Sequence, residues 1–156
     1  QGYCFGVGFE FSLACDFRIV TQCAELSLPE MKIGMIPGSG GSVRLARMIG
    51  LSRVKDMIMR GKRISGEEAF NLGLASELVD KDKIEITIEK LVDELCSISP
   101  LAQRAIKTVL NASQDAPLHV AIELEGETYG RLRSSNDFNE GVKSFVEKRK
   151  PIYKGN

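Results

Sequence analysis

The sequence predicts a mixed α/β first part followed by a run of amphipathic helices, and two observations lead to this expectation. Residues 1–49 alternate short apolar runs with glycine-rich turns, which is typical of strands and helices in close succession. From Leu51 onward most apolar residues recur at helical spacing instead. We place the boundary near Asp80, which divides the chain into residues 1–80 and 81–156.

The first elements follow from glycine turns and apolar spacing. Gly6-Val7-Gly8 leads into the apolar stretch 9–15, which predicts a buried helix after a glycine turn. Residues 16–20 alternate in polarity and predict a short strand, and residues 24–28 predict another.

An irregular stretch begins at Pro29-Glu30 and ends in the glycine-rich segment 36–41. Such a cluster of prolines and glycines predicts a loop whose backbone approaches another group closely. The elements expected after it are a helix over 42–49, a helix over 53–60, a helix capped by Ser65 and Glu68, a strand over 74–79, and helices over 84–98, from Pro100, from Pro117 to about Ser134, and after a cap at Asp137 and Glu140.

The composition excludes several classes of protein. Apolar residues make up 43% and charged residues 27% of the 156 positions, as in a folded globular protein. Basic and acidic residues balance at 21 each, so the basic excess of a nucleic-acid-binding protein is missing. No apolar run approaches the roughly 18 residues that span a membrane, and no secretory signal pattern is present.

The four cysteines, Cys4, Cys15, Cys23 and Cys96, show no C-x-x-C spacing. Three of them stand in apolar context, so we expect buried free thiols and a reducing compartment. His119 is the only histidine and lies far from every cysteine, which argues against a zinc site.

Two glutamates stand in sequence contexts that make them candidate catalytic residues. Glu10 lies between two phenylalanines in the most apolar stretch, and Glu30 follows a proline before another apolar run. Taken singly, Glu10 also fits a solvent-facing residue at a helix start, and Glu30 fits a loop carboxylate or a cap.

The glycine-rich segments narrow the chemistry further. Gly6-Val7-Gly8 ahead of a helix places backbone amides where they can hold an anionic oxygen. Only two of the three glycines of a dinucleotide fingerprint are present, and the segment 38–41 lacks the Lys-Ser or Lys-Thr of a phosphate-binding loop. Ser39 and Ser42 have no histidine near them in sequence and are poor candidate nucleophiles.

Two segments together resemble the crotonase (enoyl-CoA hydratase/isomerase) superfamily. Residues 2–16 resemble the segment in which a glycine triplet precedes the first catalytic glutamate, and residues 28–41 resemble the second active-site segment. The separation of Glu10 from Glu30 matches that of the hydratase pair. Residues 61–75 and the ending 145–151 resemble later parts of the family, so the resemblance covers essentially the whole chain as its C-terminal half.

The resemblance implies a spiral of strand-strand-helix turns followed by C-terminal helices used for assembly into a trimer or a dimer of trimers. It also implies an acyl-CoA substrate whose thioester oxygen is held by two backbone amides. One amide belongs to Val7, beside Gly8, and the other to a segment upstream of residue 1. Valine departs from the glycine that the family usually has there, and its branched side chain restricts φ.

The implied activity is that of a lyase of fatty acid metabolism, which adds water to a trans-2-enoyl-CoA to give 3-hydroxyacyl-CoA. Glu10 is then expected to activate the water, Glu30 to supply the proton, and Gly38 to offer the water a backbone contact. No metal or cofactor is expected, since coenzyme A belongs to the substrate. A carnitinyl-CoA-type dehydratase or racemase, an enoyl-CoA isomerase and a non-catalytic assembly fragment remain alternatives.

The first residue, Gln1, is not methionine, and the residues after it have the pattern of internal structure. We therefore expect a fragment that is inactive alone. The expected location is the cytoplasm, or the mitochondrial matrix in a eukaryote, without nucleic-acid or membrane partners.

Overall fold

A computed structural model describes all residues, 1–156, and divides them into two compact units. The first unit comprises Gln1–Glu89 and the second Lys90–Asn156, so the division falls inside helix α5 (Ile84–Cys96). Each unit has its own internal packing. No helix is both long and apolar enough to cross a membrane.

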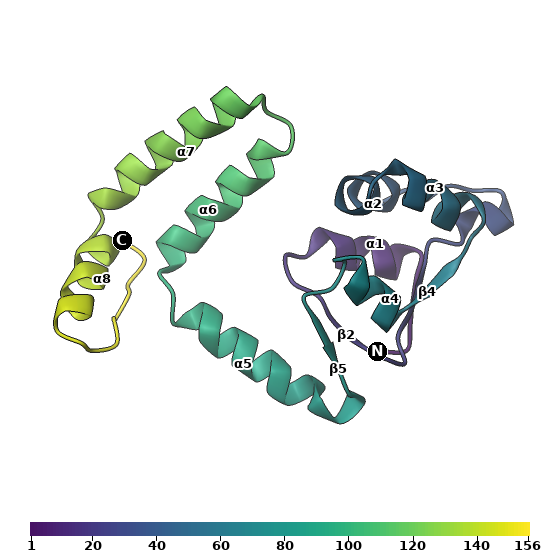
Figure 1. Ribbon diagram of the computed structural model, residues 1–156, viewed down its shortest axis with the longest axis horizontal. Coiled ribbons are helices and arrows are strands. Elements are labelled where there is room, and N and C mark those ends of the chain that lie inside the picture. The colour runs from purple at the N-terminus through teal and green to yellow at the C-terminus, as the bar shows by residue number, and fades with distance from the viewer. The chain divides into compact units, whose positions relative to one another are not determined.

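The first unit is mixed α/β, as the sequence predicts (Figure 1). Short strands alternate with helices along its whole length. Its elements are β1 (Tyr3–Phe5), α1 (Val7–Ala14), β2 (Ile19–Thr21), β3 (Glu25–Ser27), the 3₁₀ helix η1 (Glu30–Ile33), α2 (Gly41–Ile49), α3 (Leu51–Met59), β4 (Arg63–Ser65), α4 (Gly66–Asn71), β5 (Glu77–Val79) and the 3₁₀ helix η2 (Lys81–Lys83).

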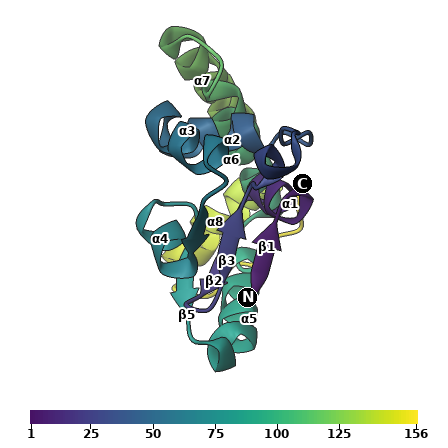
Figure 2. The same cartoon turned by 90° about the vertical axis from the view of Figure 1, so that its right-hand side faces the viewer.

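Two small sheets organise this unit. In one, β3 lies between β1 and β4, parallel to β1 and antiparallel to β4, and Figure 2 shows β1 and β3 side by side. In the other, β2 pairs in parallel with β5. The sequence did not lead us to expect β1 or β4, which comprise three residues each and lie beside glycine-rich or helical segments.

The core of the first unit lies between the sheets and the helices α1 to α4. Phe9 and Leu13 of α1 are buried together with Leu45 of α2, and these two helices pack against each other. The prediction of a buried helix after the glycine turn is confirmed. The other buried apolar residues are Val20, Ala24, Leu26, Leu28, Ile49, Val54, Met57, Ile58, Ile64, Ala69, Leu74 and Ala75.

Two polar contacts fix the ends of helices in this unit. The predicted capping box at the start of α4 is present, with Ser65 accepting from the amide of Glu68 at 3.1 Å and donating its own amide to that side chain at 2.7 Å. At the end of α1, the Arg18 guanidinium donates to the carbonyl oxygens of Ser12 (2.9 Å) and Cys15 (2.5 Å). It also donates to the carbonyl oxygen of Leu74, which ties α1 to the segment before β5.

The second unit is helical, as its apolar stripes predict. It contains the end of α5 and then α6 (Pro100–Ser113), α7 (Leu118–Arg133) and α8 (Asn136–Val146), of which α6 and α7 pack side by side (Figure 1). Pro100 occupies the first turn of α6 as expected, and the hydroxyl of Ser99 accepts from the amide of Ala102 at 3.2 Å.

The predicted cap of α8 at Asp137 and Glu140 is wrong. Ser135 caps this helix, with its hydroxyl accepting from the amide of Phe138 at 3.0 Å. Asp137 is instead buried, and it accepts from the Ser99 hydroxyl at 2.6 Å and from the amides of the C-terminal tail. A sequence pattern for a cap cannot reveal these partners, because Ser99 is 38 positions away.

The predicted burial of the cysteines is also wrong. Cys15, Cys23 and Cys96 are exposed in the chain, and Cys4 is half-buried. The three exposed thiols lie at the end of α1, in the turn between β2 and β3, and at the end of α5. Apolar neighbours in the sequence did not mean that these cysteines are buried, because helix ends and turns generally lie at the surface.

Candidate active site

Glu10 is a buried carboxylate held by backbone amides. It is the fourth residue of α1 and is only 1% exposed to solvent. One oxygen, Oε1, accepts hydrogen bonds from the amides of Ser39 at 2.8 Å and Gly41 at 2.9 Å. The alternative that Glu10 faces solvent at a helix start is therefore excluded.

The loop that donates these bonds has the shape its glycines permit. Gly40 has φ +89°, a conformation that side chains disfavour, and it precedes the first residue of α2. A β-carbon on Gly41 would lie 2.9 Å from Oε1 of Glu10 and closer still to its Cγ. The prediction that this loop approaches another group closely is confirmed, and that group is Glu10.

The same contact places Glu10 at the N-terminus of α2. Gly41 is the first residue of this nine-residue helix, and no residue before it supplies a side-chain cap. A helix N-terminus carries unpaired N–H groups and favours a negative charge. Glu10 satisfies one of these N–H groups from a distant part of the sequence, with its Oε1 atom as the acceptor.

Glu30 is the first residue of η1, which ends at Gly34 in a left-handed conformation with φ +76°. Its Oε2 atom is buried and has no hydrogen-bond partner. Its other oxygen, Oε1, lies close to Gly6, where an added β-carbon would be 2.9 Å away. A buried carboxyl oxygen without a partner is energetically costly, which favours a ligand that hydrogen-bonds to it at that position.

Gly6 links the segment that contains Glu10 to the segment that contains Glu30. Its backbone has φ +55° and ψ −128°, and its amide donates to the carbonyl oxygen of Ser27 at 3.0 Å. α1 begins directly after it without a side-chain cap, so the amides of Val7 and Gly8 have no partner one turn earlier in the helix. The structure thus brings Glu30 against the turn from which α1, with Val7, Gly8 and Glu10, begins.

The remaining candidate, Gly38, is exposed beside Ser39 in the loop, and a β-carbon added to it would meet no atom within 4 Å. The sequence alone did not lead us to expect the amides of Ser39 and Gly41 as hydrogen-bond donors to Glu10. The repeated glycines at 38, 40 and 41 were the available signal, because they mark backbone without side-chain obstruction.

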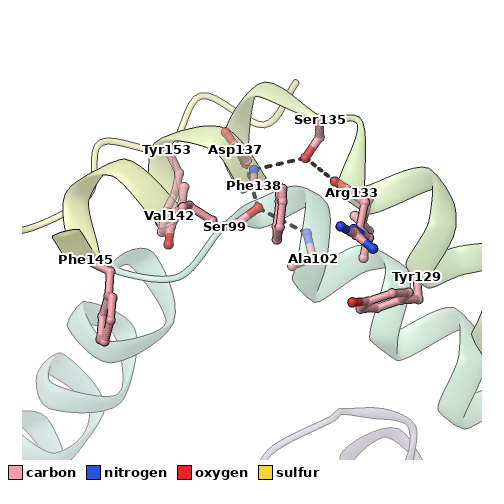
Figure 3. Close-up of a pocket in the computed structure, with 12 residues that line it drawn as sticks. Ser99, Ala102, Tyr129, Arg133, Ser135, Asp137, Phe138, Val142, Phe145 and Tyr153 are labelled. Carbon is pink, nitrogen blue, oxygen red and sulfur yellow. Dashed lines mark hydrogen bonds between the residues drawn. The ribbon is translucent and has the colours of Figure 1, made fainter.

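The helical unit, residues 90–156, contains a cavity of its own. Its volume is about 490 Å³, and apolar and aromatic side chains such as Tyr129, Phe138 and Phe145 line it (Figure 3). The buried acid in its wall, Asp137, already accepts from Ser99 at 2.6 Å. With no second carboxyl group among its lining residues, this cavity lacks an acid–base pair.

Comparison with protein families agrees with this geometry. The family model described as enoyl-CoA hydratase/isomerase matches residues 1–156. Among curated relatives, the chain is 36% identical over 99% of its length to a protein named carnitinyl-CoA dehydratase from Salmonella paratyphi A, covering 61% of that protein. It is 37% identical over 96% of its length to the mitochondrial methylglutaconyl-CoA hydratase 1 of Pyricularia oryzae, covering 48% of that protein.

Solved structures agree with the fold. The crystal structure of an enoyl-CoA hydratase from Bacillus anthracis matches with a TM-score of 0.96 and 38% identity, over 99% of this chain and 60% of that one. Another, of an enoyl-CoA hydratase subunit from Geobacillus kaustophilus, matches with a TM-score of 0.94 and 35% identity over 99% of this chain and 60% of that one. The chain thus spans about three fifths of the length of several of these relatives. Because the family model covers every residue and the fold agrees, the chain belongs to the enoyl-CoA hydratase/isomerase family, the crotonase family that the sequence resembles.

Proposed function

We propose that the complete protein containing this chain adds water across the double bond of a trans-2-enoyl-CoA to give 3-hydroxyacyl-CoA. The observation that carries this proposal is the pair of carboxyl groups in contact with one helix, α1. Glu10 projects from it, and Glu30 lies against Gly6 at its start. Hydration needs a base for water and an acid for carbon, and two carboxyl groups in different environments can divide these roles.

Glu10 is the base in this proposal. The two amide donors hold Oε1 in place, and Oε2 is left to accept a proton from water. As the water oxygen bonds to C3 of the enoyl group, its proton passes to Glu10. The electron pair of the double bond moves toward the thioester and forms an enolate.

Glu30 is the acid. Its buried Oε2 has no partner within the chain, and in this scheme it carries the proton that is donated to C2 of the enolate. The hydroxyl group and the two hydrogens are then accounted for, with Glu10 protonated and Glu30 ionised at the end of the turnover. Glu10 then releases its proton to solvent and Glu30 takes one up, which restores the starting pair.

The enolate oxygen requires hydrogen-bond donors. The free amides of Val7 and Gly8 at the start of α1 are suited to this, and the exposed side chain of Val7 points away from the core. Each such donor contributes about 3 to 4 kcal/mol to transition-state stabilisation. The chemistry draws on the thioester of coenzyme A in the substrate and on no further cofactor.

A second candidate is the dehydration of a hydroxylated acyl-CoA. Several curated relatives at 36% identity are named carnitinyl-CoA dehydratase. The same pair of carboxyl groups serves this reaction in reverse, with Glu30 removing the proton and Glu10 protonating the leaving hydroxyl group. The two candidates differ in the acyl group that is bound.

The direct test is to assay the complete protein with crotonyl-CoA and with carnitinyl-CoA. Loss of the enoyl thioester absorbance with crotonyl-CoA supports the hydratase proposal, and faster turnover of carnitinyl-CoA supports the dehydratase. Residues 1–156 alone should show negligible turnover, because the α1 amides reach the thioester oxygen from one side and the proposed oxyanion hole needs a further donor, from a different segment, on the other. Turnover of neither substrate by the complete protein would favour a non-catalytic assembly role.

A further inference from the structure

Arg44 supports the loop that holds Glu10. It lies in the first turn of α2, where its own amide donates to the carbonyl oxygen of Gly40 at 3.1 Å. Its side chain turns back along the loop, and Nη1 donates to the carbonyl oxygen of Ser39 at 3.0 Å.

Ser39 is therefore held from both sides of its backbone. Its amide donates to Oε1 of Glu10 at 2.8 Å, while its carbonyl oxygen accepts from Arg44. A residue fixed at both its N–H and its C=O has little freedom to rotate. The Arg44 contact thereby restrains the direction in which the Ser39 amide points.

Gly40 makes room for this arrangement. A β-carbon on Gly40 would overlap Nη1 of Arg44, so the guanidinium occupies space that only a glycine leaves open. The two residues on either side of Gly40 are the two amide donors to Glu10. The guanidinium thus packs on the middle of the three-residue segment that grips the carboxylate.

We propose that Arg44 is a positioning residue for hydration, acting through Ser39 to hold Glu10 in the orientation that accepts the proton from water. This inference rests on the proposed function of Glu10 as the base. Arg44 itself touches no reacting atom in this scheme. Its removal leaves the substrate contacts of Val7 and Gly8 in place.

The test compares Arg44→Ala, Arg44→Lys and the control Arg53→Ala in the complete protein. Arg53 is an exposed arginine on the next helix, α3, for which the structure gives no side-chain partner. We expect Arg44→Ala to lower kcat for crotonyl-CoA by about ten- to a hundredfold, with KM within about twofold of the wild type. Lysine can still donate one hydrogen bond to Ser39, so Arg44→Lys should recover a measurable part of kcat.

A double-mutant cycle separates positioning from a general structural role. If Arg44 acts through Glu10, adding Arg44→Ala to Glu10→Gln should produce almost no further loss of kcat. A full additional loss in the Glu10→Gln background would overturn the inference, as would an Arg44→Ala kcat equal to that of Arg53→Ala. Loss of thermal stability with unchanged kcat would equally overturn it. Absence of hydration by the wild type would remove the proposed function itself, and this inference with it.

Discussion

Gly6 and Glu30 fit against each other so closely that a β-carbon on Gly6 would lie 2.9 Å from Oε1 of Glu30. The two residues come from the turn before α1 and from the start of η1. Their contact links the segment that supplies the proposed oxyanion amides to the segment that supplies the proposed acid.

Replacing Gly6 by alanine should therefore impair turnover more than its backbone strain explains. The control is Gly2→Ala, because Gly2 also has positive φ, +68°, but has open space around it. Both variants should lose about 1–3 kcal/mol of folding free energy from backbone strain. Gly6→Ala alone should also displace Glu30 and lower kcat for crotonyl-CoA at least about tenfold. Equal kcat in the two folded variants would contradict the contact's importance.

Removing either proposed acid–base group should abolish most of the hydration. We expect Glu10→Gln and Glu30→Gln each to lower kcat by about a hundred- to ten-thousandfold, measured by the loss of enoyl thioester absorbance. Folding should persist, because the amide oxygen of glutamine can still accept from Ser39 and Gly41. Glu89→Gln, at an exposed position of α5, is the matched control. Near-normal turnover in either active-site variant would refute the assignment of the pair.

The C-terminal tail should loosen in acid, because two carboxylates hold it. Asp137 accepts from the amides of Lys154 at 2.9 Å and Gly155 at 3.1 Å, and Glu140 accepts from the amide of Ile152 at 2.8 Å. The Ser99 hydroxyl and these tail amides hold the pKa of Asp137 below its ordinary value. Hydrogen bonds from Arg149 lower the pKa of Glu140 to about 2.

A lowered pKa in the folded state means that these contacts stabilise the tail fully above the ordinary carboxyl pKa of about 4. Their contribution is lost as the pH falls from there toward about 2. Amide protection factors in the tail, corrected for intrinsic exchange, should stay constant down to about pH 5 and then fall. Asp137→Asn should lower protection already at pH 7, whereas the exposed control Asp93→Asn should not. Protection that is independent of pH down to pH 2 would rule this out.

The helical unit should pack against other subunits. Several apolar side chains of α6 and α8 are exposed in the single chain, among them Leu110 (57%), Phe145 (86%) and Val146 (74%). Exposed apolar surface of this extent favours association. We expect the complete protein to sediment as a trimer or a dimer of trimers, and a monomer at micromolar concentration would contradict this.

Local signals in the sequence were sufficient to predict the helices. The Ser65–Glu68 capping box, the apolar stripe of α5 and the glycine turn before α1 each depend on residues a few positions apart. The contacts that define the site connect distant positions. Glu10 meets an amide 31 positions later, and although the glycines at 40 and 41 mark an unobstructed backbone, nothing in the sequence links that backbone to Glu10.

The errors have the same origin. Asp137 resembled a helix cap because it stands at a helix start, but Ser99 and the tail, far from it in sequence, occupy its oxygens. Nothing in the sequence distinguishes Arg44 from the other arginines, and only the folded loop shows its contact with Ser39. Long-range backbone partners of polar side chains are what a single sequence conveys least.

The contact between Glu10 and the start of α2 bears on how this protein can change over evolution. Because the Glu10 side chain also completes a helix terminus, a descendant that lost the reaction would still be selected to keep an oxygen acceptor at position 10. Glu30 has no comparable structural role, because its buried Oε2 has no partner within the fold. Among diverged copies, the residue at position 30 should therefore report retained catalysis more faithfully than the residue at position 10.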